Sequence, residues 1–314
     1  MSDDTAASGY RRPLKYPERR ERPLMLVLYG LEYALFAGVM GLFRILGVNR
    51  ASDLGGWLAR TLGPRIPVTR RARRNMTAAM PELTKAQREA YIVDMWDSLG
   101  RTFGEYAHID RINSNGVDPR VEIVGQEHAS NAIAKGKGGL FVSGHCGNWE
   151  LMPPCIRALG LKGILVYRPQ NNPFVDAWIS KQRALGLPGL AAKGGDGARS
   201  IIKTLREGKF IAMLVDQKMN EGISVPLFGR DCMTPTGAPS LALRNGSPIV
   251  PAWCERLPGP RFRVTIYPAI PFPNTGDRDR DVYEMALSLN RFIEDRVREN
   301  PANWLWLHNR WPKK

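Results

Sequence analysis

Short apolar segments alternate with amphipathic ones from residue 121 onward, and this alternation restricts the possible folds more than any other feature. The apolar segments that resemble strands span residues 121–124, 139–143, 162–167, 210–215, 248–254 and 262–267. Segments with helical periodicity span residues 126–135, 148–159, 173–185, 198–207, 237–245 and 282–299. Strands that alternate with helices favour a parallel sheet with helices on its faces. The sequence therefore predicts an α/β fold with a central mixed or mostly parallel sheet flanked by helices.

The N-terminal part of the chain follows a different pattern. Residues 1–23 are polar and carry six basic side chains, which predicts a flexible basic leader. Residues 24–48 are apolar, with charge only at Glu32 and Arg44. At ~1.5 Å per residue they could cross the ~30 Å core of a bilayer, although Glu32 would be costly in lipid. Spanning, interfacial and buried helices all stay open. We expect an N-terminal membrane-anchor helix over residues 24–48, followed by one domain over residues 49–314.

The charge and the cysteines limit the classes of partner and cofactor. A formal net charge of +15 attracts nucleic acid, anionic lipid or an acidic carrier protein, and charge alone does not choose among them. Six arginines between residues 60 and 74 form either a solvated helix face or a patch against anionic lipid. The four cysteines form no C-x-x-C pair, so a zinc knuckle is not expected.

One hexapeptide, His-Cys-Gly-Asn-Trp-Glu at 145–150, has the position and the residues of a catalytic motif. It follows an apolar strand directly, where open α/β sheets bind their ligands. His145 can accept a proton near neutral pH, and a carboxylate can orient its ring. A helix would place Glu150 ~140° away from His145, so the two meet only if the chain turns at Gly147. We predict that His145 is a catalytic base oriented by Glu150.

A second polar pair, Asp216 and Gln217, follows the strand predicted at 210–215 and should face the same crevice. Asp216 could bind substrate or brace the loop together with Gln217, and the residues do not decide between these roles. A structural role is favoured for His308, and core or membrane-interface positions are favoured for the three C-terminal tryptophans. The spacing H-x4-E differs from the H-E-x-x-H zinc pattern, so neither a metal nor another cofactor is expected.

Taken in order along the chain, these segments resemble the late acyltransferases of lipid A biosynthesis, the lauroyl- and myristoyl-transferring enzymes of Gram-negative bacteria. The resemblance covers most of the chain and includes the apolar N-terminal stretch and the H-x4-D/E motif. The other matching segments are Tyr167–Pro173, Asp216-Gln217, Pro226–Gly229, Thr234–Gly237 and Trp304–Trp311. Two positions depart from the family pattern. Cys146 replaces an aromatic residue, and Lys218 replaces an acidic or small one.

The resemblance implies an enzyme that moves a fatty acyl chain from an acyl carrier protein thioester to a hydroxyl of a lipid A precursor. His145 would be the general base and Glu150 its orienting partner. The candidates for oxyanion stabilisation or substrate binding are Arg168, Gly147, Asn148, Asp216 and Gln217. The enzyme would act at the cytoplasmic face of the bacterial inner membrane, in contact with anionic lipid, and would bind no nucleic acid.

Three other functions fit parts of the same pattern. The acceptor could be another bacterial glycolipid, of the phosphatidylinositol mannoside type. A membrane-associated thioesterase or esterase could use the same histidine to activate water, although the G-x-S-x-G elbow of serine hydrolases does not occur in the sequence. A basic, membrane-tethered binding protein would need no catalysis at all.

Overall fold

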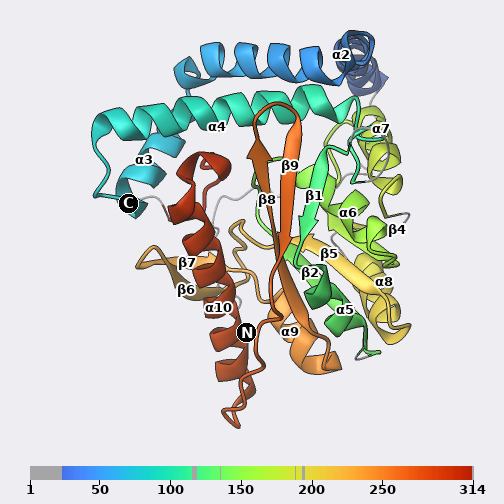
Figure 1. The fold of residues 1–314 in the computed structure, drawn as a ribbon, viewed down its shortest axis with the longest axis vertical. Helices are drawn as coiled ribbons and strands as arrows, with labels where there is room; N and C mark the ends of the chain where they lie inside the picture. Colours follow the sequence, from blue (N-terminus) through green and yellow to red (C-terminus); the bar gives the residue numbers. More distant parts are fainter. Residues whose placement is uncertain (1–22, 115–118, 135, 188, 193–194, 313–314) are drawn as a thin grey trace, which may run out of the picture.

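A computed structural model describes residues 23–312 of the 314, apart from 115–118, 135, 188 and 193–194. The leader predicted for residues 1–23 therefore lies outside the described residues, except for Pro23. Figure 1 shows a central sheet with helices on both faces and a long pair of helices across one end.

The central sheet has seven strands in the order β1-β9-β8-β2-β5-β3-β4. Their bounds are β1 Val121–Val124, β2 Gly139–Ser143, β3 Gly163–Tyr167, β4 Gly189–Ala192, β5 Phe210–Leu214, β8 Ile249–Leu257 and β9 Arg261–Ile266. All neighbouring pairs are parallel except the antiparallel β8 and β9. Strand β2 lies at the centre with every residue buried, as expected for an apolar run covered on both faces. The predicted mostly parallel α/β sheet is confirmed.

The helices that cover this sheet begin and end with recognisable signals. They are α5 Gln126–Ala134, α6 Met152–Ala158, α7 Pro173–Ala184, α8 Gly195–Arg206, α9 Gly237–Asn245 and α10 Arg278–Glu299. The Asn172 side chain accepts from the first backbone N–H groups of α7, and Asp277 does the same for α10. Helix α9 ends at Asn245 and is capped by Gly246, whose left-handed backbone suits glycine.

Three strands were missed from the sequence. Strand β4 is four residues of Gly, Leu and Ala, which have little β propensity. The antiparallel hairpin of β6 (Ile223–Leu227) and β7 (Arg230–Thr234) forms a separate two-stranded sheet. Pro226 lies inside β6, and a proline argues against a strand unless that strand is at an edge.

The N-terminal helix α2 runs over Pro23–Leu62 and changes direction at Gly47, whose φ is 77°. This bend lies next to residue 48, where the apolar stretch ends. The first part is long and apolar enough to cross a membrane, by length and composition, with a mean hydropathy of 1.7 in its most apolar window. Only 17% of that window is buried, which argues against a buried core helix.

The second part of α2 lies along α4 (Lys85–Tyr106), as Figure 1 shows. Small residues line the contact, and the two backbones touch. A Cβ added to Gly55 would lie 2.3 Å from the carbonyl oxygen of Gly100, and one added to Gly104 would lie 2.2 Å from that of Ala51. Such close packing needs glycine on both helices. The larger apolar side chains of this part therefore face outward, including Trp57 and Leu62, which are 52% and 58% exposed.

Candidate active site

His145 and Asp216 meet at the carboxyl end of the two central strands. Strands β2 and β5 pair in parallel with Ser143 opposite Leu214, and each functional residue lies two positions further along its chain. The Nδ1 atom of His145 lies 2.7 Å from Oδ1 of Asp216, and the His145 backbone N–H donates to Oδ2 over 2.8 Å. Trp304 also donates its indole N–H to Oδ2, over 2.8 Å. The carboxylate is therefore held by three donors, in a fully buried position.

The electrostatics of Asp216 determine which nitrogen of His145 carries the proton. Burial by itself raises the pKa of Asp216, but the charge and hydrogen bonds of His145, together with the charge of the nearby His308, hold that pKa well below its ordinary value. An ionised carboxylate only accepts hydrogen bonds, so Nδ1 of His145 is the donor. The Nε2 atom then carries the lone pair, which faces the Gln217 amide nitrogen 3.2 Å away and can accept a proton, as a general base requires.

A second histidine lies on the other side of the ring. The ring centroids of His145 and His308 are 4.6 Å apart, and the Gln217 amide nitrogen lies 3.2 Å from Nε2 of His145 and 3.4 Å from Nδ1 of His308. Burial lowers the pKa of His308 to about 4, against the opposing effect of Asp216. His308 is therefore neutral at physiological pH. It lies within the site, although the sequence favoured a structural role.

The ligand atoms of His145, Asp216 and His308 all lie within 4.8 Å of one another, which is close enough to hold a metal ion. Both oxygens of Asp216 are already occupied, because Oδ1 accepts from His145 and Oδ2 accepts from His145 and Trp304. A metal ion bound to Asp216 would compete with these hydrogen bonds. The three residues therefore fit a proton-transfer cluster better than a metal site.

The low pKa of His308 predicts that the free energy of unfolding depends on pH. Its pKa falls from an ordinary 6.5 to about 4 on folding, so in this range the unfolded chain binds a proton that the folded protein does not. The contribution of neutral His308 to the free energy of unfolding is complete above pH 6.5 and is lost as the pH falls toward 4. We expect His308→Asn to flatten the pH dependence of the unfolding free energy in this window, by up to about 3 kcal/mol. Urea titrations between pH 4 and 6.5 measure the free energy of unfolding. His128→Asn on α5 is the control. If the unfolding free energy of His308→Asn depended on pH as steeply as that of the wild type, the prediction would be contradicted.

Glu150 does not occupy the position expected for it. The chain turns at Gly147, whose φ is 52°, and the short 3-10 helix Trp149–Leu151 then carries Glu150 toward α7. There its carboxylate accepts from Arg183 over 2.6 and 2.8 Å, and from Tyr106 over 3.3 Å. Trp149 connects it to the site indirectly, because the indole N–H donates to Glu150 and the ring lies 5.2 Å from that of His145. The turn thus occurs as expected, but the carboxylate on the imidazole belongs to Asp216.

The other predicted site residues have different surroundings. Gly147 donates its N–H to the carbonyl oxygen of Asn303 over 2.9 Å, so this N–H is not available to an oxyanion. Asn148 is fully buried behind the turn, and its amide donates to Glu105. Arg168 follows β3 at the same edge of the sheet as His145, and it is exposed.

Two further residues near the site, Arg183 and Trp304, were not singled out as site residues from the sequence. Arg183 comes from α7 and neutralises Glu150, and Trp304 from the C-terminal segment donates to Asp216. Trp304 begins the C-terminal segment that resembles the family, but no local pattern predicts that either residue reaches the site, since each does so only through tertiary contacts.

Comparison with known proteins identifies the family. The model of the bacterial lipid A biosynthesis acyltransferases matches residues 19–313. The chain belongs to this family. It is 27% identical to the lipid A biosynthesis lauroyltransferase of Escherichia coli K12 over 243 residues, and this alignment covers 76% of each chain. It is 23% identical over 289 residues to the phosphatidylinositol mannoside acyltransferase of Mycobacterium tuberculosis H37Rv, which covers 89% of this chain and 88% of the relative.

Another relative is the lipid A biosynthesis acyltransferase of Haemophilus influenzae, 23% identical over 241 residues, or 76% of this chain and 73% of the relative. These relatives are all named as acyltransferases, and each name includes a glycolipid, lipid A or phosphatidylinositol mannoside. The resemblance noted from the sequence is confirmed. The protein is an acyltransferase, and its family supports acyl transfer to a glycolipid.

Proposed function

We propose that this acyltransferase moves a fatty acyl chain from an acyl carrier protein thioester to a hydroxyl of a lipid A precursor. The observation that carries the proposal is the His145–Asp216 pair, which leaves Nε2 of His145 able to accept a proton at the edge of the sheet. The family match supplies the class of acceptor.

In the proposed reaction, Nε2 of His145 removes the proton of the acceptor hydroxyl as its oxygen attacks the thioester carbonyl. The C–O bond forms and a tetrahedral oxyanion develops. Collapse of this intermediate breaks the C–S bond, and the leaving thiolate takes the proton from the imidazolium. Asp216 keeps Nδ1 protonated and offsets the positive charge on the ring. His145 ends the cycle in its starting state, so no other proton donor is required.

Other residues have supporting roles in this proposal. Arg168 is the proposed oxyanion donor, because it follows a strand at the edge that also carries His145, and its side chain is exposed. Gln217 would contact the acceptor, since its amide lies beside Nε2 of His145. Glu150 would hold Arg183 and Trp149 in place next to the ring, rather than orient His145 itself.

The acyl donor is proposed from charge complementarity. Acyl carrier protein is strongly acidic, and the net charge of this chain is +15. Opposite charges on two partners increase the rate of encounter and select the partner. The donor proposal therefore predicts that transfer slows as ionic strength rises.

A second acceptor, a phosphatidylinositol mannoside, is favoured by one observation. The mycobacterial relative matches 89% of the chain, whereas the E. coli lauroyltransferase matches 76% at slightly higher identity. Purified protein should be given acyl carrier protein thioesters with either a lipid A precursor or a phosphatidylinositol mannoside, and the products identified by mass spectrometry. An acylated lipid A precursor that His145→Ala fails to form supports the first proposal. Acylation of the mannoside alone would replace the acceptor, and release of free fatty acid alone would indicate a thioesterase.

The proposed location is the cytoplasmic face of the inner membrane, with α2 in contact with anionic lipid. Many large apolar side chains of α2 are exposed on both sides of the bend, for example Leu35 and Ile45 before it and Trp57 and Leu62 after it. Arg50, Arg60 and Arg65 are exposed on the second part and its end. An outward apolar face edged by arginines is suited to the interface of a membrane.

The four native cysteines are buried, so a fluorescent thiol label on Trp57→Cys would be selective. We expect phosphatidylglycerol vesicles to shift the emission of this label to the blue and to shield it from iodide. The same label on Asp279→Cys, an exposed position at the start of α10, should stay accessible to iodide. Equal quenching at both positions would contradict the proposed membrane contact.

A further inference from the structure

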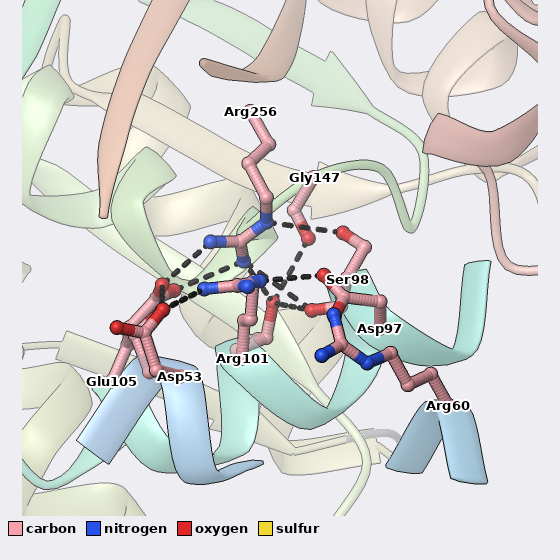
Figure 2. Close-up of polar contacts among 10 residues, drawn as sticks. Asp53, Arg60, Asp97, Ser98, Arg101, Glu105, Gly147 and Arg256 are labelled. Carbon is pink, nitrogen blue, oxygen red and sulfur yellow. Dashed lines mark hydrogen bonds and ion pairs between the residues drawn. The ribbon is translucent and has the colours of Figure 1, made fainter. Parts of the chain in front are cut away.

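The catalytic turn rests on a buried acid of α4. Glu105 is fully inaccessible to solvent, and four donor atoms surround its carboxylate. Arg256 of β8 donates from both terminal nitrogens, over 2.5 and 3.0 Å. Ser52 of α2 donates its hydroxyl over 2.7 Å, and Asn148 of the turn donates its amide over 2.9 Å. Figure 2 shows this carboxylate facing the guanidinium of Arg256.

The same arginine reaches the turn by a second route, and Figure 2 shows Gly147 close to Arg256. Arg256 donates to the hydroxyl oxygen of Thr102 over 2.9 Å. The single proton of this hydroxyl is shared between two carbonyl oxygens, that of Ser98 at 2.9 Å and that of Gly147 at 3.1 Å. Two consecutive residues of the turn, Gly147 and Asn148, are therefore connected to one buried ion pair. From the opposite side, Leu305 donates its backbone N–H to the carbonyl oxygen of His145 over 3.0 Å.

A buried ion pair is weak evidence for stability. Removing two charges from water is costly, and apolar side chains of similar size often stabilise a fold as well or better. The hydrogen bonds around this pair instead converge on one short segment, the turn that carries His145. One turn atom, Oδ1 of Asn148, is buried without a hydrogen-bond partner in the described structure, so the turn also carries an energetic cost. This arrangement points to a role in geometry rather than in stability.

We propose that Glu105 and Arg256 are positioning residues for the reaction: they fix the turn at Gly147 and Asn148, and so hold the His145 ring against Asp216. Ser52 extends the same network to the second part of α2, so the outward-facing helix and the catalytic turn share one buried acid. This inference rests on the proposed role of His145 as the base. A displacement of the ring by about 1 Å can cost about 10²-fold in rate, so a network that prevents it has a large effect on turnover.

The test compares steady-state kinetics of purified variants in the acyl-transfer assay. We expect Glu105→Gln, which keeps the shape and removes the charge, to lower kcat by about 10- to 100-fold while KM for the acyl donor stays within about threefold. Asn148→Asp places a second carboxylate against Glu105 and should also lower kcat. The double variant Glu105→Gln/Asn148→Asp exchanges the amide and the carboxylate across the same hydrogen bond. It should recover most of the lost kcat.

The matched control is Asp97→Asn on the same helix. Asp97 accepts from Arg60 and Arg101 in a network next to the Glu105–Arg256 pair, and Figure 2 shows it beside Arg60. Its kcat should equal that of the wild type. If Glu105→Gln proves too unstable to purify, Thr102→Val removes the hydroxyl that lies between Arg256 and Gly147 and should lower kcat about 3- to 10-fold.

The outcomes separate this inference from the proposed function. A wild-type protein without transferase activity would defeat the proposed function, whatever the variants do. An active wild type with a Glu105→Gln variant that only melts earlier, at unchanged kcat, would overturn the positioning role alone. A double variant no better than the single ones would also overturn it, because the hydrogen bond between positions 105 and 148 would then not be what positions His145.

Discussion

Replacing Asp216 by Asn is expected to lower kcat by about 10³- to 10⁴-fold with little change in fold. The reason lies in the donors around the side chain. The backbone N–H of His145 and the indole N–H of Trp304 both point at Oδ2, so the amide oxygen of Asn must take that place. The amide NH2 then faces Nδ1 of His145. The imidazole is forced into the tautomer with its proton on Nε2, which cannot accept another.

The matched comparison for this variant is Glu150→Gln. The carboxylate of Glu150 pairs with Arg183 and is separated from His145 by Trp149, so we expect a smaller loss of kcat, of about tenfold. Both variants should be purified and compared for kcat, KM and circular dichroism. If Glu150→Gln lost as much activity as Asp216→Asn, the orienting carboxylate would be Glu150, as the H-x4-E spacing first indicated.

The substitution Gly100→Ala, which adds one methyl group, is expected to destabilise the protein by about 3 kcal/mol. The new Cβ would lie 2.1 Å from the carbonyl oxygen of Gly55 and 2.4 Å from Cβ of Ala59, so α2 and α4 would have to separate. Activity should fall as well, because Ser52 and Glu105 meet across the same pair of helices. Thermal unfolding in detergent, followed by circular dichroism, measures the stability.

Gly38→Ala in the first part of α2 provides the opposite case. A Cβ at Gly38 would meet nothing within 4 Å, and alanine favours a helix over glycine by about 1 kcal/mol. The same substitution should therefore be neutral or stabilising at position 38 and destabilising at position 100. Equal melting temperatures for the two variants would show that the helices are not in backbone contact.

Much of the fold follows from local patterns in the sequence. Apolar segments of the length of a strand predicted six of the seven strands of the central sheet, and β2 was predicted with the bounds it has in the structure. Strand β4 and the β6–β7 hairpin have too little β-forming character, or a proline, to be recognised. Their formation depends on neighbouring strands and helices, which a local window does not contain.

The site was predicted less completely than the fold. His145 and Asp216 could both be placed at the sheet edge, because each follows an apolar strand. The role of Glu150 was inferred from its closeness in sequence to His145, and its partner Arg183 is 33 residues further along the chain. Glu105 is likewise 43 residues from Asn148, and nothing in the sequence around either residue indicates that they meet.

His145 and Asp216 each lie two residues after a strand end, Ser143 of β2 and Leu214 of β5, which affects how chains of this fold should be compared. His145 and Asp216 are 71 positions apart, and this separation can change through insertions or deletions in surface loops without moving either side chain relative to the other. One residue added after Ser143, by contrast, would shift the imidazole by about 3.3 Å along the strand and separate it from its acid. The acidic partner should therefore be sought by counting from the end of the paired strand, and not by a fixed distance in sequence from the histidine.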